Sequence, residues 1–518
     1  MEIRYASIFN DALGPVTPGP SSSNTCGPIR IGRLCRRIFG EQPNSFTVEM
    51  SSQGSYPGSF LGMRSDLGFL TGILDRPATH PRFLNAREDA AAAGIAFQYR
   101  YRDDLPGDPP ELAVLTLASA EREMTFTGVS EGGGAFRIER VNGCPTSLRG
   151  DCWELLLLCG PGVTPGGELR AAAQGLGRLT CTAGEGGTLL RVQSARPIPE
   201  EEAARLSALC GPCLARVLPP ESPVVFVEGA KPPFTAPAEF IAWQRARDVP
   251  LWRAAAAYEG ALSGWTEEQV LHYADGVFSC VERSAAAGLQ PGLDLAGIVS
   301  PRAAQVTGAF GGGTLLPLGV ADFGAPAALA VMEYSNASGT IVCIPTGGAS
   351  GVVPGALLGA GRAMGLDRGE LVKALLVAGL AGVFMAKTQY FGALGCQAEV
   401  GCAAGMAAAG LVSLLGGDGA QACAAASMAI QSLLGLVCDP VGGLVQVPCF
   451  IRNMTGVSVA AVCANAAMAG LEHVVPLEEM VDAMLRVGEH IRCTRCNRLG
   501  AESTPTGLRL AEELKKRP

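Results

Sequence analysis

The chain has 518 residues, of which 48% are hydrophobic, 17% charged and 6% aromatic, and its formal net charge is −8 at pH 7. At roughly 150 residues per domain this length predicts about three domains, and the apolar content excludes a disordered chain. Because the net charge is negative, the chain lacks the excess of positive charge that binds the phosphate backbone of a nucleic acid, so we expect no nucleic-acid partner.

Residues 1–150 combine short β-branched or alternating runs with glycine-rich turns. Residues 111–118 and 135–141 have the alternation typical of strands, and residues 69–74 have a helical pattern. This region is therefore predicted to be an α+β domain.

A second pattern covers residues 151–218. It predicts a strand, a helix, two strands and a second helix in the order expected of a small ferredoxin-like α+β domain. These elements are placed at 153–158, 168–176, 179–181, 188–192 and 200–210. The proline-rich residues 219–237 are predicted to be a linker.

Residues 238–518 follow the helical period, with Ala- and Gly-rich segments separated by glycine and proline loops. They predict an all-α domain. The most apolar stretch, between Lys373 and Lys387, is shorter than the roughly 18 residues of a membrane-spanning helix, so we expect buried helices and no membrane partner. The N-terminal residues lack the pattern of a secretory signal, which favours a cytoplasmic location.

Eighteen cysteines in such a chain are expected to be mostly buried small apolar residues rather than disulfides. Three of them, Cys396, Cys438 and Cys449, stand within two residues of Gly or Pro in loops. Irregular backbone of this kind suits a thiolate that holds a metal or an iron-sulfur cluster. From the residues alone, a role in the core is favoured over metal binding.

Two segments that carry these cysteines resemble a known family. GCQAEVGCAAGMAAAGLVSLLGG (395–417) and LGLVCDPVGGLVQVPCFIRN (434–453) are similar to the two cluster-binding segments of the iron-sulfur-dependent L-serine dehydratases. The resemblance implies that Cys396, Cys438 and Cys449 hold a [4Fe-4S] cluster. It leaves Cys402, Cys423 and Cys463 in the core.

The resemblance extends over nearly the whole chain. Gly14-Pro15, the loop 19–25 and residues 62–66 resemble the β domain of the family, residues 151–218 resemble an ACT-like regulatory domain, and residues 499–507 resemble the C-terminal segment. The implied organisation is a β-like domain (1–150), an ACT-like domain (151–218), a linker (219–237) and an all-α iron-sulfur catalytic domain (238–518) in one chain.

Such an enzyme is a lyase that converts L-serine to pyruvate and ammonia. Three thiolate ligands leave one iron of the cluster open, and this iron can act as a Lewis acid on the β-hydroxyl group of serine. Pyridoxal phosphate is not required by this chemistry.

The substrate is expected at two loops rich in glycine and hydroxyl groups. The predicted substrate-binding residues are Ser21, Ser22, Ser23, Asn24, Thr25, Arg64, Thr346, Gly347 and Gly348. Considered without the family, the first loop is more simply an ordinary hydrogen-bonded turn, and Arg64 a surface arginine.

Three positions depart from the family pattern. Asn24 and Met63 stand where the family usually has histidines, and Gly347 stands at a usual asparagine. The catalytic base is therefore not assigned. Two alternatives stay open: a related lyase for another small hydroxy or amino acid, and a non-catalytic sensor of a cluster or an amino acid.

Two CxxC pairs are further candidate redox or metal-binding sites. Cys210 and Cys213 could form a redox pair, or a zinc site together with Cys493 and Cys496. One of the last two could instead cap the open iron. Because ACT-like domains bind effectors between copies, we also expect a homodimer.

Overall fold

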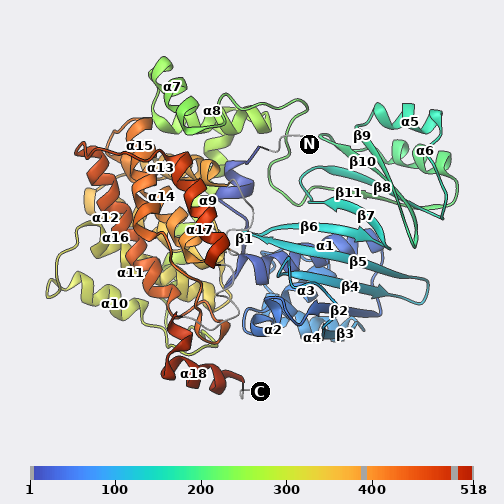
Figure 1. Cartoon of the computed structure of the whole chain (residues 1–518), viewed down its shortest axis with the longest axis horizontal. Coiled ribbons are helices and arrows are strands. Elements are labelled where there is room, and N and C mark those ends of the chain that lie inside the picture. The colour runs from blue at the N-terminus through green and yellow to red at the C-terminus, as the bar shows by residue number, and fades with distance from the viewer. Residues whose placement is uncertain (1–4, 387–393, 492–499, 516–518) are drawn as a thin grey trace. The chain divides into compact units, whose positions relative to one another are not determined.

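The computed structural model describes residues 5–386, 394–491 and 500–515 (Figure 1). Over these residues the chain forms two compact units. Unit 1 comprises Met1–Ser22, Gly132–Gly134 and Lys231–Pro518, and unit 2 comprises Ser23–Glu131 and Ala135–Ala230. The described part of the N-terminal segment thus packs with the helical unit, although the sequence-based boundaries place it in the first domain.

Unit 2 begins with a six-stranded sheet of order β3-β2-β4-β5-β6-β7. The strand β2 is parallel to β3 and antiparallel to β4. The elements are η2 (Ser22–Cys26), α1 (Gly27–Phe39), β2 (Ser45–Ser51), α2 (Tyr56–Ser59), α3 (Ser65–Ile73), η3 (Phe83–Asn85), α4 (Ala86–Ala92), β3 (Ala96–Arg102), β4 (Leu112–Ala118), β5 (Glu123–Gly132), β6 (Ala135–Val141) and β7 (Cys144–Leu148).

The strands and the helix predicted for this region are confirmed as β4, β6 and α3. In β4 the alternation places Ala113, Leu115 and Leu117 in the interior, where they pack in one hydrophobic core with residues of α1 and α3. Burial of one face of the sheet against these helices therefore explains the alternating pattern.

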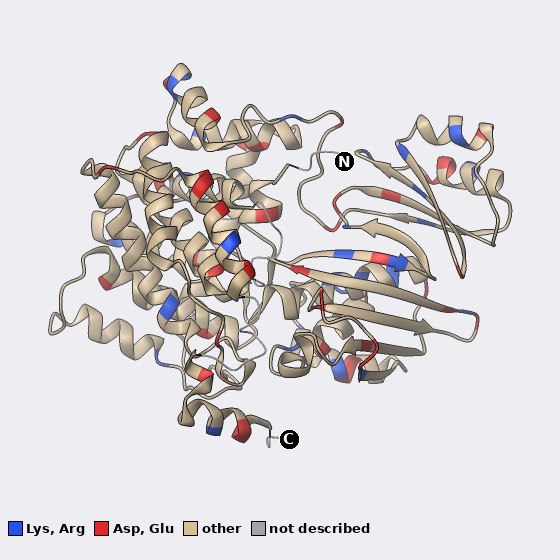
Figure 2. Cartoon of the chain, in the orientation of Figure 1, with Lys and Arg blue, Asp and Glu red and all other residues tan. Residues whose placement is uncertain are grey.

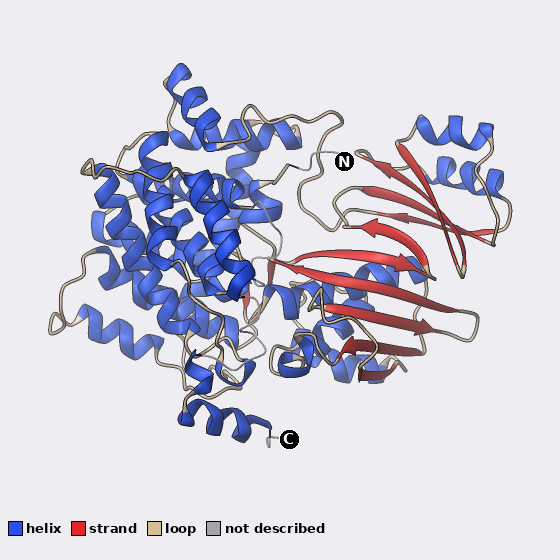
Figure 3. Ribbon diagram, viewed as in Figure 1, coloured by secondary structure: helices blue, strands red, loops and turns tan. Residues whose placement is uncertain are grey.

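A second, four-stranded antiparallel sheet of order β11-β8-β10-β9 follows, with two helices (Figure 3). Its elements are β8 (Trp153–Cys159), α5 (Gly167–Gln174), β9 (Arg178–Gly184), β10 (Gly187–Ser194), α6 (Glu200–Cys210) and β11 (Cys213–Leu218). This βαββαβ order is that of the ferredoxin-like motif. Leu155 and Leu157 pack in a core with residues of α5 and α6, whereas Leu156 packs in the core of the six-stranded sheet. The sequence did not predict β11.

Unit 1 is helical, as predicted for the C-terminal part, but its described residues also include the strand β12, which pairs with β1 in an antiparallel ribbon. The elements are η1 (Ile8–Ala12), β1 (Val16–Pro18), α7 (Pro237–Arg247), α8 (Leu251–Ser263), α9 (Glu267–Gly288), α10 (Ala303–Gly311), α11 (Val320–Asn336), β12 (Thr340–Val342), η4 (Gly347–Ala349), α12 (Val352–Met364), α13 (Arg368–Met385), α14 (Cys396–Leu414), α15 (Gly419–Leu433), η6 (Val441–Gly443), α16 (Cys449–Met468), α17 (Leu477–Ile491), η8 (Gly500–Ser503) and α18 (Pro505–Lys515).

The helix α14 lies in the interior of unit 1, packed against α12, α13, α15 and α16. By length and composition it is the one described helix that could cross a membrane, yet 83% of its most apolar window is buried inside the protein. Charged residues are sparse along these helices (Figure 2). Close packing of Ala and Gly side chains therefore accounts for its composition.

A buried carboxylate anchors the N-terminal segment to the helices of unit 1. Glu259 of α8 is fully buried, and its two oxygens accept hydrogen bonds from Ser7 Oγ at 2.5 Å and from Ile8 N at 2.7 Å. Burial raises the pKa of Glu259 to about 7, although these hydrogen bonds oppose the shift. The hydrogen bonds of Glu259 thus fix the start of η1, while burial of the charged carboxylate opposes folding.

This anchor predicts a pH-dependent stability. The pKa of Glu259 is about 7 in the folded protein and 4.5 for an ordinary glutamate. The folded state therefore favours the protonated carboxyl group. Its contribution to the unfolding free energy is fully present below pH 4.5 and is lost as the pH rises through 7. In Glu259→Gln this titration is absent. The difference in unfolding free energy between wild type and variant should therefore fall by up to about 3 kcal/mol over this range, measured by urea denaturation. A pH-independent difference, or the same slope in the exposed control Glu268→Gln, would contradict the assignment.

Candidate metal centre and substrate loops

The three predicted metal ligands come together in unit 1. Cys396 is the first residue of α14, Cys449 is the first residue of α16, and Cys438 lies in the loop between α15 and η6. The thiol of Cys396 is hydrogen-bonded to Cys438 and lies within electrostatic reach of Cys449. Gly395, with φ 80°, allows the sharp entry into α14 that places Cys396 at the helix end.

A buried glutamine holds this arrangement in place. Gln397, which is 0% exposed, donates from its backbone N to Leu436 O at 3.0 Å. Its side chain donates to Met484 O at 3.0 Å and accepts from Gly435 N at 2.9 Å. The loop that leads to Cys438 is therefore fixed against the start of α14. The sequence analysis did not identify Gln397, because its partners are distant in the chain.

The electrostatics of the thiols favour a positively charged ligand. The hydrogen bond to Cys438 and burial raise the pKa of the Cys396 thiol, and burial followed by the charge of Cys438 raises the pKa of Cys449. Three adjacent thiols, of which that of Cys396 is buried and those of Cys438 and Cys449 are partly exposed, cannot all ionise readily unless a cation compensates their charge. Part of that compensation is built in, since Cys396 and Cys449 lie at helix N-termini, where the helix dipole favours thiolates.

Arg452 is a second group that the sequence analysis missed. It lies on the first turn of α16, pairs with Asp439 at 2.8 Å and donates from Nη1 to Val437 O at 2.8 Å. Burial lowers the pKa of Arg452, but Cys396 and Asp439 outweigh this effect and raise it. A permanent positive charge thus lies beside the thiols.

Five of the nine predicted substrate-binding residues belong to the same unit as the cysteines. They are Ser21, Ser22, Thr346, Gly347 and Gly348. The ribbon of β1 and β12 leads into both of their loops, which touch at Gly347. Thr346 is 1% exposed, and its Oγ1 makes no hydrogen bond with any described residue. A buried hydroxyl group without a partner is costly, so it suits a site that a polar ligand completes.

The other four predicted residues, Ser23, Asn24, Thr25 and Arg64, belong to unit 2. Asn24 is 6% exposed and accepts a hydrogen bond from Ser59 Oγ at 2.9 Å, while Thr25 Oγ1 donates to Met63 O at 2.7 Å.

Arg64 is half-buried, with φ 59°, immediately before α3. It is therefore not the freely exposed arginine expected from its residue type alone.

The packing at Gly347 explains why this chain lacks a side chain there. A Cβ atom at this position would lie 2.8 Å from Ser22 N and 3.0 Å from Pro20 O, both of which are backbone atoms. We expect Gly347→Ala to push the two loops apart and to raise the KM for the substrate that the resemblance implies by about tenfold, measured by steady-state kinetics. Gly276→Ala, in open space on α9, is the matched control. An unchanged KM would show that the loops do not bind the substrate together.

Asn453 joins the second substrate loop to the cysteines. This residue of α16 is 0% exposed, and its Nδ2 donates to Gly348 O at 2.8 Å and to Cys449 O at 2.9 Å. Its Oδ1 accepts from Gly351 N at 3.0 Å. One side chain thus sets the distance between the loop and the first turn of α16.

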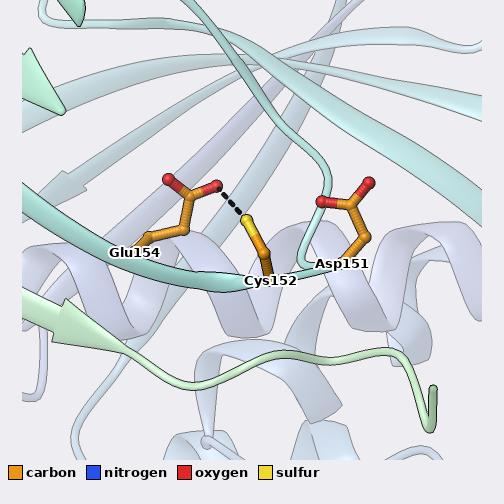
Figure 4. A group of neighbouring side chains, drawn as sticks. All are labelled: Asp151, Cys152 and Glu154. Atoms are coloured by element: carbon orange, nitrogen blue, oxygen red, sulfur yellow. Dashed lines mark hydrogen bonds between the residues drawn. The ribbon is translucent and has the colours of Figure 1, made fainter. Parts of the chain in front are cut away.

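A different cluster, in unit 2, has the residue types of a metal site, but its carboxylate is already paired with an arginine and its thiol is disfavoured as a thiolate. The ligand atoms of Asp151, Cys152 and Glu154 lie within 4.8 Å of one another (Figure 4). Arg191 already donates to both oxygens of Glu154, at 2.6 and 2.5 Å, and burial raises the pKa of the Cys152 thiol. We therefore assign this group to a structural ion pair.

The CxxC pair of unit 2 gains no support as a redox site. Cys210 ends α6 and Cys213 begins β11, and burial raises the pKa of Cys210, whereas a redox-active thiol needs a lowered one. Cys493 and Cys496, the other members of the predicted zinc site, lie outside the described residues.

Comparisons with known proteins agree with these features. Residues 197–496 match the family model described as the serine dehydratase alpha chain. A probable L-serine dehydratase alpha chain of Bacillus subtilis (strain 168) is 34% identical over 262 residues, which cover 50% of this chain and 87% of the relative.

The corresponding probable beta chain of that organism is 37% identical over 149 residues, which cover 29% of this chain and 66% of the relative. L-serine dehydratase 2 of Escherichia coli (strain K12) is 41% identical over 181 residues, which cover 33% of this chain and 39% of the relative. Both an alpha chain and a beta chain thus have counterparts within this single polypeptide.

Proposed function

The chain belongs to the iron-sulfur L-serine dehydratase family, with the beta and alpha parts fused, and from this premise we propose that it converts L-serine to pyruvate and ammonia. The observation that carries the proposal is the convergence of Cys396, Cys438 and Cys449 beside the loop of Thr346 in one unit.

The donor set fits a [4Fe-4S] cluster. The thiols of Cys396 and Cys449 lie at helix N-termini and that of Cys438 in a neighbouring loop, and the raised pKa values of Cys396 and Cys449 indicate a site that needs a cation before all three thiols can ionise. When bound, the cluster would supply a Lewis-acidic iron that polarises the β-hydroxyl group of serine.

The protein itself binds and orients the substrate. The backbone and hydroxyl groups of Ser21, Ser22 and Thr346 are suited to a carboxylate, and the unpartnered Oγ1 of Thr346 would gain a hydrogen bond there. Asn453 keeps this loop at a set distance from Cys449.

We further propose that the βαββαβ part is an ACT-like regulatory domain that binds a small effector at an interface between copies, so that the active form is a homodimer. The fold order and the sheet order β11-β8-β10-β9 support this assignment. A cytoplasmic location, with no membrane or nucleic-acid partner, fits a small-molecule enzyme of this type.

The decisive experiment is an anaerobic assay of the full chain after reconstitution with iron and sulfide. We expect a cluster absorbance together with equal amounts of pyruvate and ammonia from L-serine. Asn24 and Gly347 favour one alternative, in which another small hydroxy or amino acid is the better substrate, and a panel of such acids in the same assay tests it. Binding of serine without product would instead indicate a sensor.

A further inference from the structure

The N-terminal segment that carries Ser21 and Ser22 is held by a helix far along the chain. Glu259 of α8 is fully buried and accepts hydrogen bonds from the side chain of residue 7 and from the backbone N of residue 8. The neighbouring Tyr258 donates from its hydroxyl group to the backbone O of residue 6 at 2.9 Å. The start of the segment is therefore fixed on α8.

Backbone contacts join this anchor to the first substrate loop. The turn η1 ends at Ala12 and β1 begins at Val16, so that residues 13–15 alone separate the anchored turn from the ribbon of β1 and β12. Directly after β1, Gly19 N donates to the backbone O of residue 339 at 3.0 Å. A displacement of η1 would therefore be transmitted to residues 19–22.

The position of this loop matters because it adjoins the second substrate loop. A Cβ atom at Gly347 would lie 2.8 Å from Ser22 N. The two loops thus pack backbone against backbone, next to the buried hydroxyl group of Thr346. A small shift of one loop would change the distance between the groups that meet the substrate, and such misplacement weakens binding.

We propose that Glu259 is a positioning residue for the reaction: by fixing the N-terminal segment on α8, it keeps Ser21 and Ser22 at the distance from Thr346 that substrate binding requires. This inference rests on the proposed function, because it assumes that the two loops bind the substrate together. A desolvated carboxylate adds little net stability, whereas its directional hydrogen bonds fix one position of the segment.

The test uses Glu259→Gln in the reconstituted full chain. The amide oxygen can still accept from Ile8 N, but the NH2 group cannot accept from Ser7 Oγ. We expect the KM for serine to rise about fivefold while kcat changes by less than about twofold. Hydrogen exchange of the backbone at residues 16–22, measured by mass spectrometry, should become about tenfold faster.

Glu333→Gln is the matched control. Glu333 of α11 is 1% exposed, and its carboxylate accepts from Arg302 N at 2.7 Å and from Ala303 N at 3.0 Å. The control thus alters a second buried glutamate of unit 1 that binds backbone N–H groups outside the N-terminal segment. It should change neither the KM nor the exchange of residues 16–22.

A double-mutant cycle tests whether the bond to Ser7 is responsible. Ser7→Ala removes the same hydrogen bond from the other side, so the variant with both changes should raise the KM no further than the single changes do. A wild-type KM in Glu259→Gln, or an equal rise in Glu333→Gln, overturns the inference. If wild type forms no product from serine, the proposed function has failed, and the exchange of residues 16–22 alone decides whether Glu259 holds the loop.

Discussion

Replacement of Cys438 by alanine is expected to remove both the cluster and the activity. Cys438 contacts Cys396 and acts electrostatically on Cys449, so its loss leaves two thiols at a site that needs three. After anaerobic reconstitution we expect less than about one iron per chain, against about four in wild type. Loss of the Lewis acid should lower pyruvate formation from serine at least about a thousandfold.

The matched control for this prediction is Cys402→Ala. Cys402 lies on α14, less than two turns after Cys396, and is fully buried, and burial raises the pKa of its thiol. Its replacement should cost about 1 kcal/mol of stability and leave the iron content unchanged. A cluster absorbance that persists in Cys438→Ala, or that disappears in Cys402→Ala, would show that the ligands are wrongly assigned.

Local patterns in the sequence predict much of the fold. In β4, alternate residues are fully buried, and this period is visible in the sequence itself. The strand β11 was missed because its residues Cys213–Val217 are all half-buried, which gives no alternation to recognise. The pairing of β1 with β12 joins segments more than 300 residues apart, and no local pattern encodes such a contact.

In the candidate site, too, some residues could be predicted from the sequence and others could not. The glycine- and proline-rich surroundings singled out the three cysteines, but only the family resemblance predicted them as ligands, and they converge in unit 1. Gln397 and Asn453 were not predicted, because a buried amide in a helix acquires its role only through partners elsewhere in the chain. The absence of a side chain at Gly347, which the sequence showed only as a departure, follows from the backbone of residues 20–22.

Asn453→Ala is expected to impair both stability and catalysis. The substitution leaves Gly348 O, Cys449 O and Gly351 N without the amide that now pairs with them. Buried groups that lose their partner should lower the unfolding free energy by about 2–3 kcal/mol, measured by chemical denaturation. Because the same bonds position the substrate loop against Cys449, kcat/KM for serine should fall about a hundredfold even where the variant is fully folded.

The position of Asn453, and not the loss of an asparagine as such, must cause this effect. Asn465→Ala removes an exposed asparagine from the same helix and should change neither quantity. In Asn453→Asp the side chain keeps its size and an acceptor for Gly351 N, but it can no longer donate to Gly348 O and Cys449 O. If this variant retained the wild-type kcat/KM with an intact cluster, the two donated bonds would not position the loop, and Asn453 would serve stability alone.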